Sequence, residues 1–476
     1  MKAMSKIFAA LLAAAMLTSF VACGSTTKEV QPAAPAAEEK ASPAKVEEPA
    51  KKVKIILWEK PFPDSNPAEI AQYELREKRF KEKFPNVEVE YKNWFSNTDY
   101  RQEYDKALMA GNAPAVIAQL PYVDVPSRIA NKTIADITEY VNGWGLKKEN
   151  KVWTAFDEAL SKDGKWYGVP YNYYLAGITY NVATIKAGGG DPDKLPKTWD
   201  EFTAMGQKIS DPSKARFGYA LMGFDWNAWE FTPWVWSAGG EMVTNNTDGT
   251  YKIGFNEEPG VDAAMLWHDT IWKHKMTQKN VLAEFNEFKT EIQSGRCAFG
   301  WMVPMDHFPD AKDRFNQKEE DFGVIKIPGK TADKAVTFSG GAVWLFNPKN
   351  DKDQMKAAWD YVQMVSYDEQ YILEEGKLMA EKGRLIPGAC VRTDLVDKYL
   401  AMAPWPDRWK KDMAELAKGI VKPEPFCPHW GDLKNAIAKP IQKIILKENI
   451  TREETKQILD AAADELYKKF PDTFKK

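Results

Sequence analysis

The sequence is poor in the residues that most often hold metals or form disulfides. Its 476 residues include four His and four Cys, and none of them has the spacing of a zinc-binding motif. We therefore expect no metal site and no cofactor. A basic excess is missing as well, because 65 Lys and Arg stand against 68 Asp and Glu, a net charge of −3. This balance excludes a nucleic-acid footprint, which needs clustered positive charge.

A hydrophobic run long enough to cross a membrane comfortably is also missing near the N-terminus. Residues 7–22 are apolar and follow two lysines, which is typical of a secretory signal rather than of a membrane span. The run ends Ala-Cys-Gly, which is similar to a bacterial lipobox, although Phe20 stands where Leu is usual. In a lipobox the cysteine, here Cys23, is diacylated and becomes the mature N-terminus; ordinary signal cleavage is the alternative. We predict a signal peptide over residues 1–22 and an extracytoplasmic lipoprotein anchored to a membrane.

Large apolar residues are almost absent from the next segment, residues 23–52, which is mostly Ala, Pro, Glu and Lys. Such a segment cannot bury enough area to offset the entropy of ordering. It reads as a tether that spans about 30 Å when flexible and about 90 Å when stiffened by proline. The folded part should begin near Val53. If Cys23 is lipidated, three cysteines remain, so at least one thiol is unpaired.

The first part of the fold alternates between strands and helices, which predicts a parallel α/β layer. We expect strands over 53–57, 87–91 and 115–120 and helices over 67–84 and 99–110. Trp58 and Glu59 follow the first strand at its carboxyl end, where open α/β sheets place ligands. Both are therefore candidate binding residues.

Aromatic residues are plentiful: 18 Trp, 18 Tyr and 23 Phe. Four of the tryptophans, Trp226, Trp229, Trp234 and Trp236, fall within eleven residues. We predict a helix that begins at Asn227, directly after the first of them. A packed core is one interpretation. The other is a sugar site, because sugar C–H faces stack on aromatic rings and hydroxyls need polar partners such as Glu230. We predict that this cluster supplies a stacking platform.

Residues 163–202 carry the most specific pattern in the chain. Asp163 and Gly164 form a hairpin-type turn, and two extended segments follow over 166–171 and 175–180. Thr198 is a good helix N-cap, and Glu201 completes a capping box.

In order and spacing, this stretch closely resembles the middle of the family 1 extracellular solute-binding proteins of sugar ABC transporters. The matching pieces are Asp-Gly-Lys at 163–165, Tyr-Gly at 167–168, Pro170, Tyr-Asn at 180–181 and Pro-x-Thr-Trp-Asp-Glu at 196–201. Further landmarks lie at 294–301, 339–346 and 383–387. Two departures are a missing Asp after Pro114 and Phe299 in place of Met.

The resemblance implies a periplasmic-binding-protein-like type II fold, with two α/β lobes and three crossings between them. Lobe one would comprise residues 53–170 plus 337–392, and lobe two residues 171–336 plus 393–476. The crossings near Tyr171, Gly340 and Pro387 should act as hinges.

The same resemblance implies a monomeric carbohydrate receptor that delivers its ligand to the permease subunits of an ABC importer and is not an enzyme. Ligand would bridge the lobes and favour the closed state. The full set of candidate binding residues is Trp58, Glu59, Tyr171, Asn172, Trp226, Trp229, Glu230, Trp234, Trp236, Trp301, Asp306, Gly340, Gly341, Trp344, Trp405 and Trp430.

Two other functions stay open on the residues alone. Aromatics with carboxylates also suit a polyamine or another cation. A surface glycan hydrolase would need two carboxylates about 5–10 Å apart, for which Asp225, Glu230 and Asp306 are available.

Overall fold

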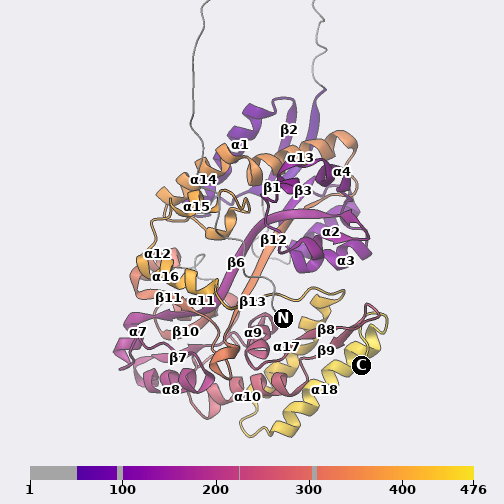
Figure 1. The fold of residues 1–476 in the computed structure, drawn as a ribbon. Coiled ribbons are helices and arrows are strands. Elements are labelled where there is room, and N and C mark those ends of the chain that lie inside the picture. Colours follow the sequence, from indigo (N-terminus) through magenta and orange to yellow (C-terminus); the bar gives the residue numbers. More distant parts are fainter. Residues whose placement is uncertain (1–50, 94–99, 225, 303–307) are drawn as a thin grey trace, which may run out of the picture. The chain divides into compact units, whose positions relative to one another are not determined.

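A computed structural model describes residues 51–93, 100–224, 226–302 and 308–476, and Figure 1 shows their arrangement. Residues 51–476 form one compact unit. The predicted signal peptide and Cys23, most of the predicted tether, Asp225 and Asp306 lie outside the described residues. Within the described part, no helix combines the length and apolar character needed to cross a bilayer.

The first elements confirm the predicted alternation of strand and helix. Strands β1 and β2 pair in parallel, starting with Val53 opposite Val87. Helix α1 begins with Pro67 in its first turn, and the side chain of Asn66 caps it by accepting from Ala68 N. The early elements are β1 (Val53–Lys60), α1 (Pro67–Lys83), β2 (Val87–Asn93), α2 (Tyr100–Ala110), β3 (Val116–Pro121), α3 (Val125–Ala130), α4 (Thr138–Gly143), α5 (Gly145–Lys148) and α6 (Asp157–Leu160).

Two long strands organise the rest of the molecule. The first half of strand β6 (Gly168–Asn181) pairs antiparallel with the second half of strand β12 (Val336–Phe346). The last residues of β12 continue along β3, while the second half of β6 pairs with β10 and β11. Figure 1 shows both strands running from one group of elements to the other. The two extended segments predicted around Pro170 and Gly177 are thus one continuous strand.

The local signals of the 163–202 stretch are confirmed. Strands β4 (Ser161–Lys162) and β5 (Lys165–Trp166) pair across a two-residue turn. Asp163 and Gly164 both have positive φ, 51° and 75°, as a twist-compatible hairpin turn requires. Helix α8 begins after Thr198, and the capping box with Glu201 is present.

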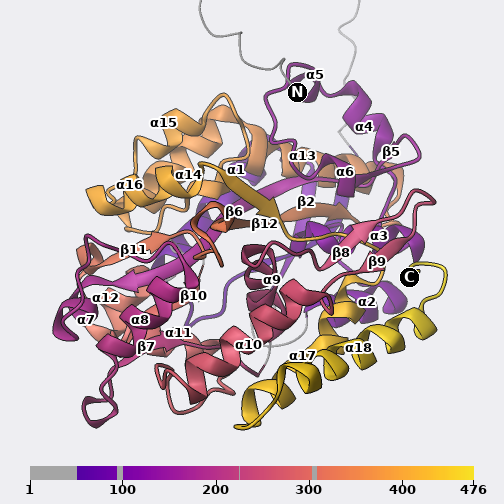
Figure 2. The same ribbon diagram turned by 60° about the horizontal axis from the view of Figure 1, so that its bottom comes forward.

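We call the elements around β1, β2 and β3 lobe one and those around β7, β10 and β11 lobe two. Helices α9, α10, α17 and α18 pack on one another in lobe two, as Figure 2 shows. The remaining elements are α7 (Val182–Ala187), α8 (Trp199–Ile209), β7 (Phe217–Ala220), α9 (Asn227–Ser237), β8 (Val243–Asn245), β9 (Tyr251–Ile253), α10 (Glu258–Trp272), α11 (Phe285–Gln293), β10 (Cys297–Met302), α12 (Phe308–Phe315), β11 (Phe322–Ile325), α13 (Lys352–Tyr367), α14 (Glu369–Glu381), α15 (Val396–Leu400), α16 (Asp407–Leu416), β13 (Ile420–Pro423), α17 (Trp430–Leu446) and α18 (Arg452–Lys469).

The segment that follows the predicted boundary at residue 392 first packs on lobe one. Helix α15 packs on α14, and Leu395, Tyr399 and Ala403 share a buried cluster with Ala68 of α1. Helix α16 packs against β11 instead. Apolar contacts thus hold Leu395, Tyr399 and Ala403 against lobe one before the chain reaches α16.

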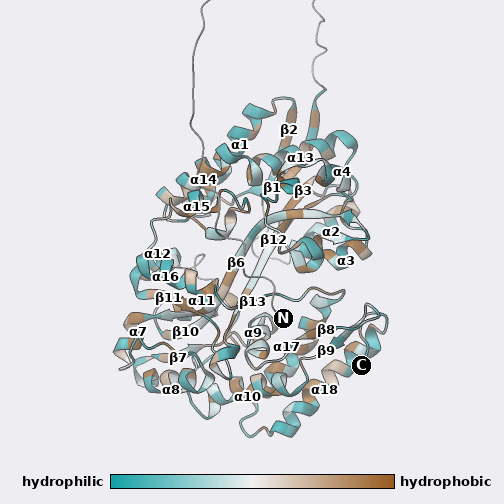
Figure 3. Cartoon of the chain, viewed as in Figure 1, coloured by the Kyte–Doolittle hydropathy of each residue, from teal (hydrophilic) through white to brown (hydrophobic). Residues whose placement is uncertain are grey.

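Burial explains why the fold holds together. Strands β7 and β12 are almost entirely buried, and hydrophilic residues are visible along helices such as α18 (Figure 3). Cys297, Cys390 and Cys427 are all buried and free, so more than one thiol is unpaired.

Candidate functional site

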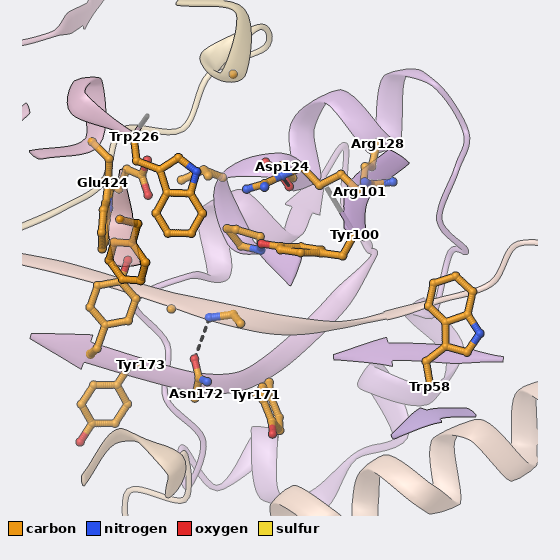
Figure 4. Close-up of a pocket in the computed structure, with 18 of the residues that line it drawn as sticks. Trp58, Tyr100, Arg101, Asp124, Arg128, Tyr171, Asn172, Tyr173, Trp226 and Glu424 are labelled. Atoms are coloured by element: carbon orange, nitrogen blue, oxygen red, sulfur yellow. Dashed lines mark hydrogen bonds and ion pairs between the residues drawn. The ribbon is translucent and has the colours of Figure 1, made fainter. Parts of the chain in front are cut away.

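A cavity of about 1290 Å³ lies between the lobes, beside the middles of β6 and β12. Lobe one lines it with the end of β1, the start of α1 and the segment after β3. Lobe two lines it with the residues before α9 and the start of α17. Figure 4 shows Trp58 at one end of the site and Trp226 with Glu424 at the other. The cavity is thus at the carboxyl ends of β1 and β3, and the first of these is where the sequence predicted a ligand.

The lobe-one end of the cavity is a buried charge network. Arg76 donates to Glu59 Oε2 at 2.8 Å and to Glu375 Oε1 at 3.0 Å. The hydroxyl of Tyr371 also donates to Glu375 Oε1, at 2.8 Å. Burial raises the pKa of Glu59, an effect that the adjacent Arg76 opposes. Glu59 lines the cavity as predicted, but one of its oxygens is already engaged. Trp58 also lines it and is 7% exposed.

The middle of β6 forms one wall of the cavity. Asn172 Oδ1 accepts from Ala342 N at 2.9 Å (Figure 4), which fixes its side chain. Tyr173 stacks on Trp153 with 4.2 Å between ring centroids. Tyr171, Asn172 and Gly341 line the cavity, whereas Gly340 is not among the lining residues. A Cβ at Gly340 would lie 2.2 Å from the hydroxyl of Tyr174, so this glycine is explained by packing.

The two tryptophans at the start of α9 form the aromatic part of the site. Trp226 is 54% exposed and has left-handed backbone, with φ 55°. Its ring lies 5.9 Å from Trp229 and 4.9 Å from Phe285. All three rings line the cavity. An exposed indole held in a disfavoured backbone conformation is typical of a binding surface.

Buried polar groups fix this Trp226 segment. Asn227 Nδ2 donates to Gly223 O at 3.2 Å and to Ala438 O at 2.9 Å. Gln442 Nε2 donates to Phe224 O at 2.9 Å. The strained conformation of Trp226 is therefore held in place by contacts from α9 and α17.

The other two tryptophans of α9 are core residues. Trp234 is fully buried and Trp236 is 3% exposed; Trp234 packs on Phe202 and Trp236 on Phe338. Neither lines the cavity. Three further indoles, Trp301, Trp344 and Trp405, also lie outside its lining. The first two are buried in β10 and β12, and the third is partly buried between two apolar clusters.

Glu230 also lies away from the cavity. It is fully buried, its Oε2 accepts from Met222 N at 2.9 Å, and its Oε1 accepts from the hydroxyl of Tyr219. Burial raises the pKa of Glu230 to about 8. The prediction that it accepts ligand hydroxyls is not supported, because both oxygens bind within the protein.

The start of α17 supplies residues that sequence reasoning missed. Trp430 lines the cavity, as predicted. Glu424 and Lys434 line it too, and neither was among the predicted residues. Trp430 Nε1 and Lys434 Nζ both donate to Glu424 Oε1, at 2.8 and 2.6 Å. One sequence signal could have identified Glu424. The residue lies directly before Pro425, on an irregular segment, and six residues before the predicted Trp430.

Each arginine that lines the described cavity is paired with a carboxylate. Arg101 bonds Asp124 at 2.6 Å, and Arg128 bonds Asp105 at 2.9 Å. Arg384 of lobe one reaches α12 of lobe two, where it bonds Asp310 and Asp313, each at 2.7 Å. Arg76 is paired as described above, and Lys434 pairs with Glu424. The described lining thus offers no cation that lacks an acidic partner.

Among the described residues, no group of three or more His, Cys, Asp or Glu side chains is arranged to hold a metal ion. The arrangement that remains is aromatic surface with fixed hydrogen-bonding groups. Phe62, Trp226 and Ile386, which are large apolar residues with exposed surface, all line the same cavity. Apolar surface gathered in a hollow suits a ligand that is partly apolar and partly polar.

Comparison with known proteins agrees with this architecture. The family described as bacterial extracellular solute-binding protein matches residues 64–371, more than half of the chain, and the chain belongs to this family. The fold is accordingly the two-lobed α/β fold of solute-binding proteins.

Individual relatives are distant. The sn-glycerol-3-phosphate-binding periplasmic protein UgpB of Yersinia pestis (bv. Antiqua, strain Antiqua) is 25% identical over 290 residues, which is 56% of this chain and 61% of that protein. The diacetylchitobiose-binding protein DasA of Streptomyces coelicolor is 25% identical over 358 residues, covering 73% of this chain and 75% of that protein. The structure of a solute-binding protein from Thermotoga lettingae, bound with α-D-tagatose, matches with a TM-score of 0.71 at 21% identity, covering 88% of this chain and 99% of that one.

Proposed function

We propose that this protein binds an uncharged carbohydrate between its lobes and delivers it to an ABC importer. The observation that carries the proposal is the composition of the cavity, which combines the exposed ring of Trp226 with arginines and a lysine that are already paired with carboxylates. Sugar rings stack on indoles, and their hydroxyls bond to groups held in fixed positions. Lobe closure around the ligand then presents the permease subunits with a recognisable state.

The ligand-binding residues that we propose are those that were predicted and also line the cavity: Trp58, Glu59, Tyr171, Asn172, Trp226, Trp229, Gly341 and Trp430. Lobe one would comprise residues 53–170 plus 337–403, and lobe two the remainder from 171. A monomer and the absence of catalysis are part of the same proposal.

Some relatives are named for binding sugars and others for binding glycerol 3-phosphate. The charges of the cavity help to decide which of these two ligand classes fits this protein. A phosphate dianion needs positive groups that are free to pair with it. Since Arg76, Arg101 and Arg128 already pair with carboxylates, a phosphoester would have to displace those bonds. A neutral sugar displaces none of them. A polyamine is not favoured, since the relatives above are named for sugars or a glycerophosphate.

Thermal-shift measurements test the proposal directly. The purified protein is heated with N,N′-diacetylchitobiose, maltose, tagatose, glycerol 3-phosphate and spermidine. We expect a neutral sugar to stabilise it, by about 2.7 kcal/mol at one hundred times the dissociation constant. Stabilisation by glycerol 3-phosphate or spermidine alone would contradict a carbohydrate receptor.

The membrane anchor is a separate part of the proposal and is supported by the sequence around Cys23. We propose that Cys23 carries the lipid and that the tether separates it from the binding unit. The variant Cys23→Ala should appear in the soluble fraction and bind ligand with unchanged affinity. Retention of this variant in membranes would show that the anchor lies elsewhere.

A further inference from the structure

We infer that Glu424 is a specificity-determining acceptor for a ligand hydroxyl and that Trp430 and Lys434 position it. The inference rests on the proposed function and names one atom, Glu424 Oε2, as the part of the carboxylate that meets the ligand.

The backbone of Glu424 is fixed from both lobes. The residue follows β13, and its N–H donates to Ser339 O of β12 at 2.9 Å. Its carbonyl accepts from the hydroxyl of Tyr122, which follows β3 in lobe one, at 2.5 Å. The Tyr122 ring in turn stacks on Phe156 with 4.3 Å between centroids. Glu424 is therefore held at the seam between the lobes.

The side chain of Glu424 is oriented by two donors on α17. Trp430 Nε1 and Lys434 Nζ, at 2.8 and 2.6 Å, both meet Oε1. The residue is only 4% exposed, so the carboxylate has little freedom to turn. An acceptor that is held before ligand arrives loses less entropy on binding.

The second oxygen of this carboxylate is the one left for a ligand. Glu424 Oε2 accepts no hydrogen bond from the described residues, and it is not among their buried atoms that lack a partner. Both side-chain hydrogen bonds of Glu424 meet Oε1, so Oε2 is the oxygen available to a ligand. Glu424 lines the cavity, and Figure 4 shows it at the same end of the site as Trp226. A sugar stacked on that indole has hydroxyl groups within the same end of the site.

Lys434 offsets the charge of Glu424. We therefore do not expect Glu424 to bind a cationic ligand. The ion pair leaves an acceptor with little net charge, and such a group suits a hydroxyl donor better than an ammonium ion. A hydrogen bond to an ionised group discriminates more strongly than one between neutral groups.

The variant Glu424→Gln tests the inference because it changes the hydrogen-bonding role of one position only, that of Oε2. Both donors point at Oε1, so the amide oxygen takes that place and the amide NH₂ takes the place of Oε2. The acceptor that faces the cavity becomes a donor, while the internal bonds and the side-chain shape are kept. We expect the affinity for N,N′-diacetylchitobiose, or for whichever neutral sugar of the panel above binds most tightly, to fall roughly 10- to 100-fold. The melting temperature should change little.

The matched control is Glu415→Gln, which removes the same charge outside the cavity. Glu415 is exposed and pairs with exposed Lys418, so its variant should bind the sugar as the unchanged protein does. A second variant, Trp430→Phe, keeps the carboxylate and removes one of its two positioning donors. We expect it to lose affinity by a smaller factor than Glu424→Gln.

Deoxy derivatives of the same sugar separate hydroxyl recognition from a general effect on the site. In the unchanged protein, one deoxy position should cost as much affinity as Glu424→Gln does. In the Glu424→Gln variant, removal of that same hydroxyl should cost nothing more. A structural role for Glu424 would instead lower the affinity for every derivative equally.

The outcomes distinguish this inference from the function on which it rests. If the unchanged protein binds none of the sugars, the proposed function fails and the inference fails with it. If the unchanged protein binds a sugar and Glu424→Gln binds it equally well, the receptor function stands and the role of Glu424 is overturned.

Discussion

The two halves of helix α9 carry the same kind of residue and use it in opposite ways. At its start, Trp226 is 54% exposed in the cavity, with Trp229 beside it; near its end, Trp234 is fully buried. The difference lies in what each half packs against. The later half packs on Phe202 of α8 and Phe338 of β12, whereas Trp226 contacts Trp229 and Phe285, which line the cavity. Residue type and helical spacing therefore do not decide between core and ligand surface.

Removal of a core ring should have the largest effect. Trp234→Ala leaves a void against Phe202 and Tyr219, so we expect the free energy of unfolding to fall by about 3–5 kcal/mol. Urea denaturation measures this loss. The fraction that remains folded should bind ligand with unchanged affinity. A specific loss of affinity without loss of stability would place Trp234 in the site and break the comparison.

Removal of the exposed ring of Trp226 should lower ligand affinity and leave stability unchanged. Trp226→Ala deletes a side chain with few internal contacts, so stability should hold. The affinity for the sugar identified by thermal shift should fall by about 2 kcal/mol, or roughly thirtyfold. Calorimetric titration measures this change. A melting temperature lowered as strongly as in Trp234→Ala would instead make Trp226 part of the core.

The buried carboxyl between the two halves of α9 should make stability depend on pH. Burial raises the pKa of Glu230 to about 8 from the ordinary 4.5. The folded state therefore keeps a proton that the unfolded state releases above its lower pKa. Stability should be greatest below the unfolded value and fall as pH rises toward the folded one, by at most about 1.4 kcal/mol per pH unit.

The variant Glu230→Gln isolates this contribution, because its amide does not titrate. Its free energy of unfolding should show a flatter fall between about pH 5 and pH 8, with the pH dependence of the unchanged protein as reference. Identical slopes in the two proteins would assign the effect to other groups.

The ring beside Trp226 should give the smallest effect. Phe285 lies 4.9 Å from Trp226 in a tilted arrangement. Phe285→Ala removes one support of the exposed indole, so affinity should fall by about 0.5–1.5 kcal/mol. Combined with Trp226→Ala it should add little, since both changes act on the same platform. Fully additive losses would indicate two independent ligand contacts.

Much of the fold was predictable because its signals are local. The first strands and α1, the Asp163–Gly164 turn and the Thr198 cap depend on residues close in sequence, and all are confirmed. The continuous strand β6 was not predictable in the same way. Its two halves were expected as separate segments over 166–171 and 175–180, yet pairing with β12, β10 and β11 keeps the chain extended throughout.

The candidate site was predictable in part. Trp58, Glu59 and Asn172 were found because strand ends and chain crossings mark ligand positions, and the structure places them at the cavity. Glu424 was missed, since nothing in its neighbours along the chain shows that Tyr122 and Ser339 hold it. Glu230 was chosen for a place beside two indoles, but its bonds to Met222 and Tyr219 turn it inward.

The sequence by itself determined the family, the alternation of strand and helix and the abundance of tryptophan, because these depend on local patterns and composition. Only the tertiary structure decided which indoles and which carboxylates line the cavity. Those properties arise from segments far apart in the chain, such as Glu424 between Tyr122 and α17, and burial is fixed only when such segments pack together.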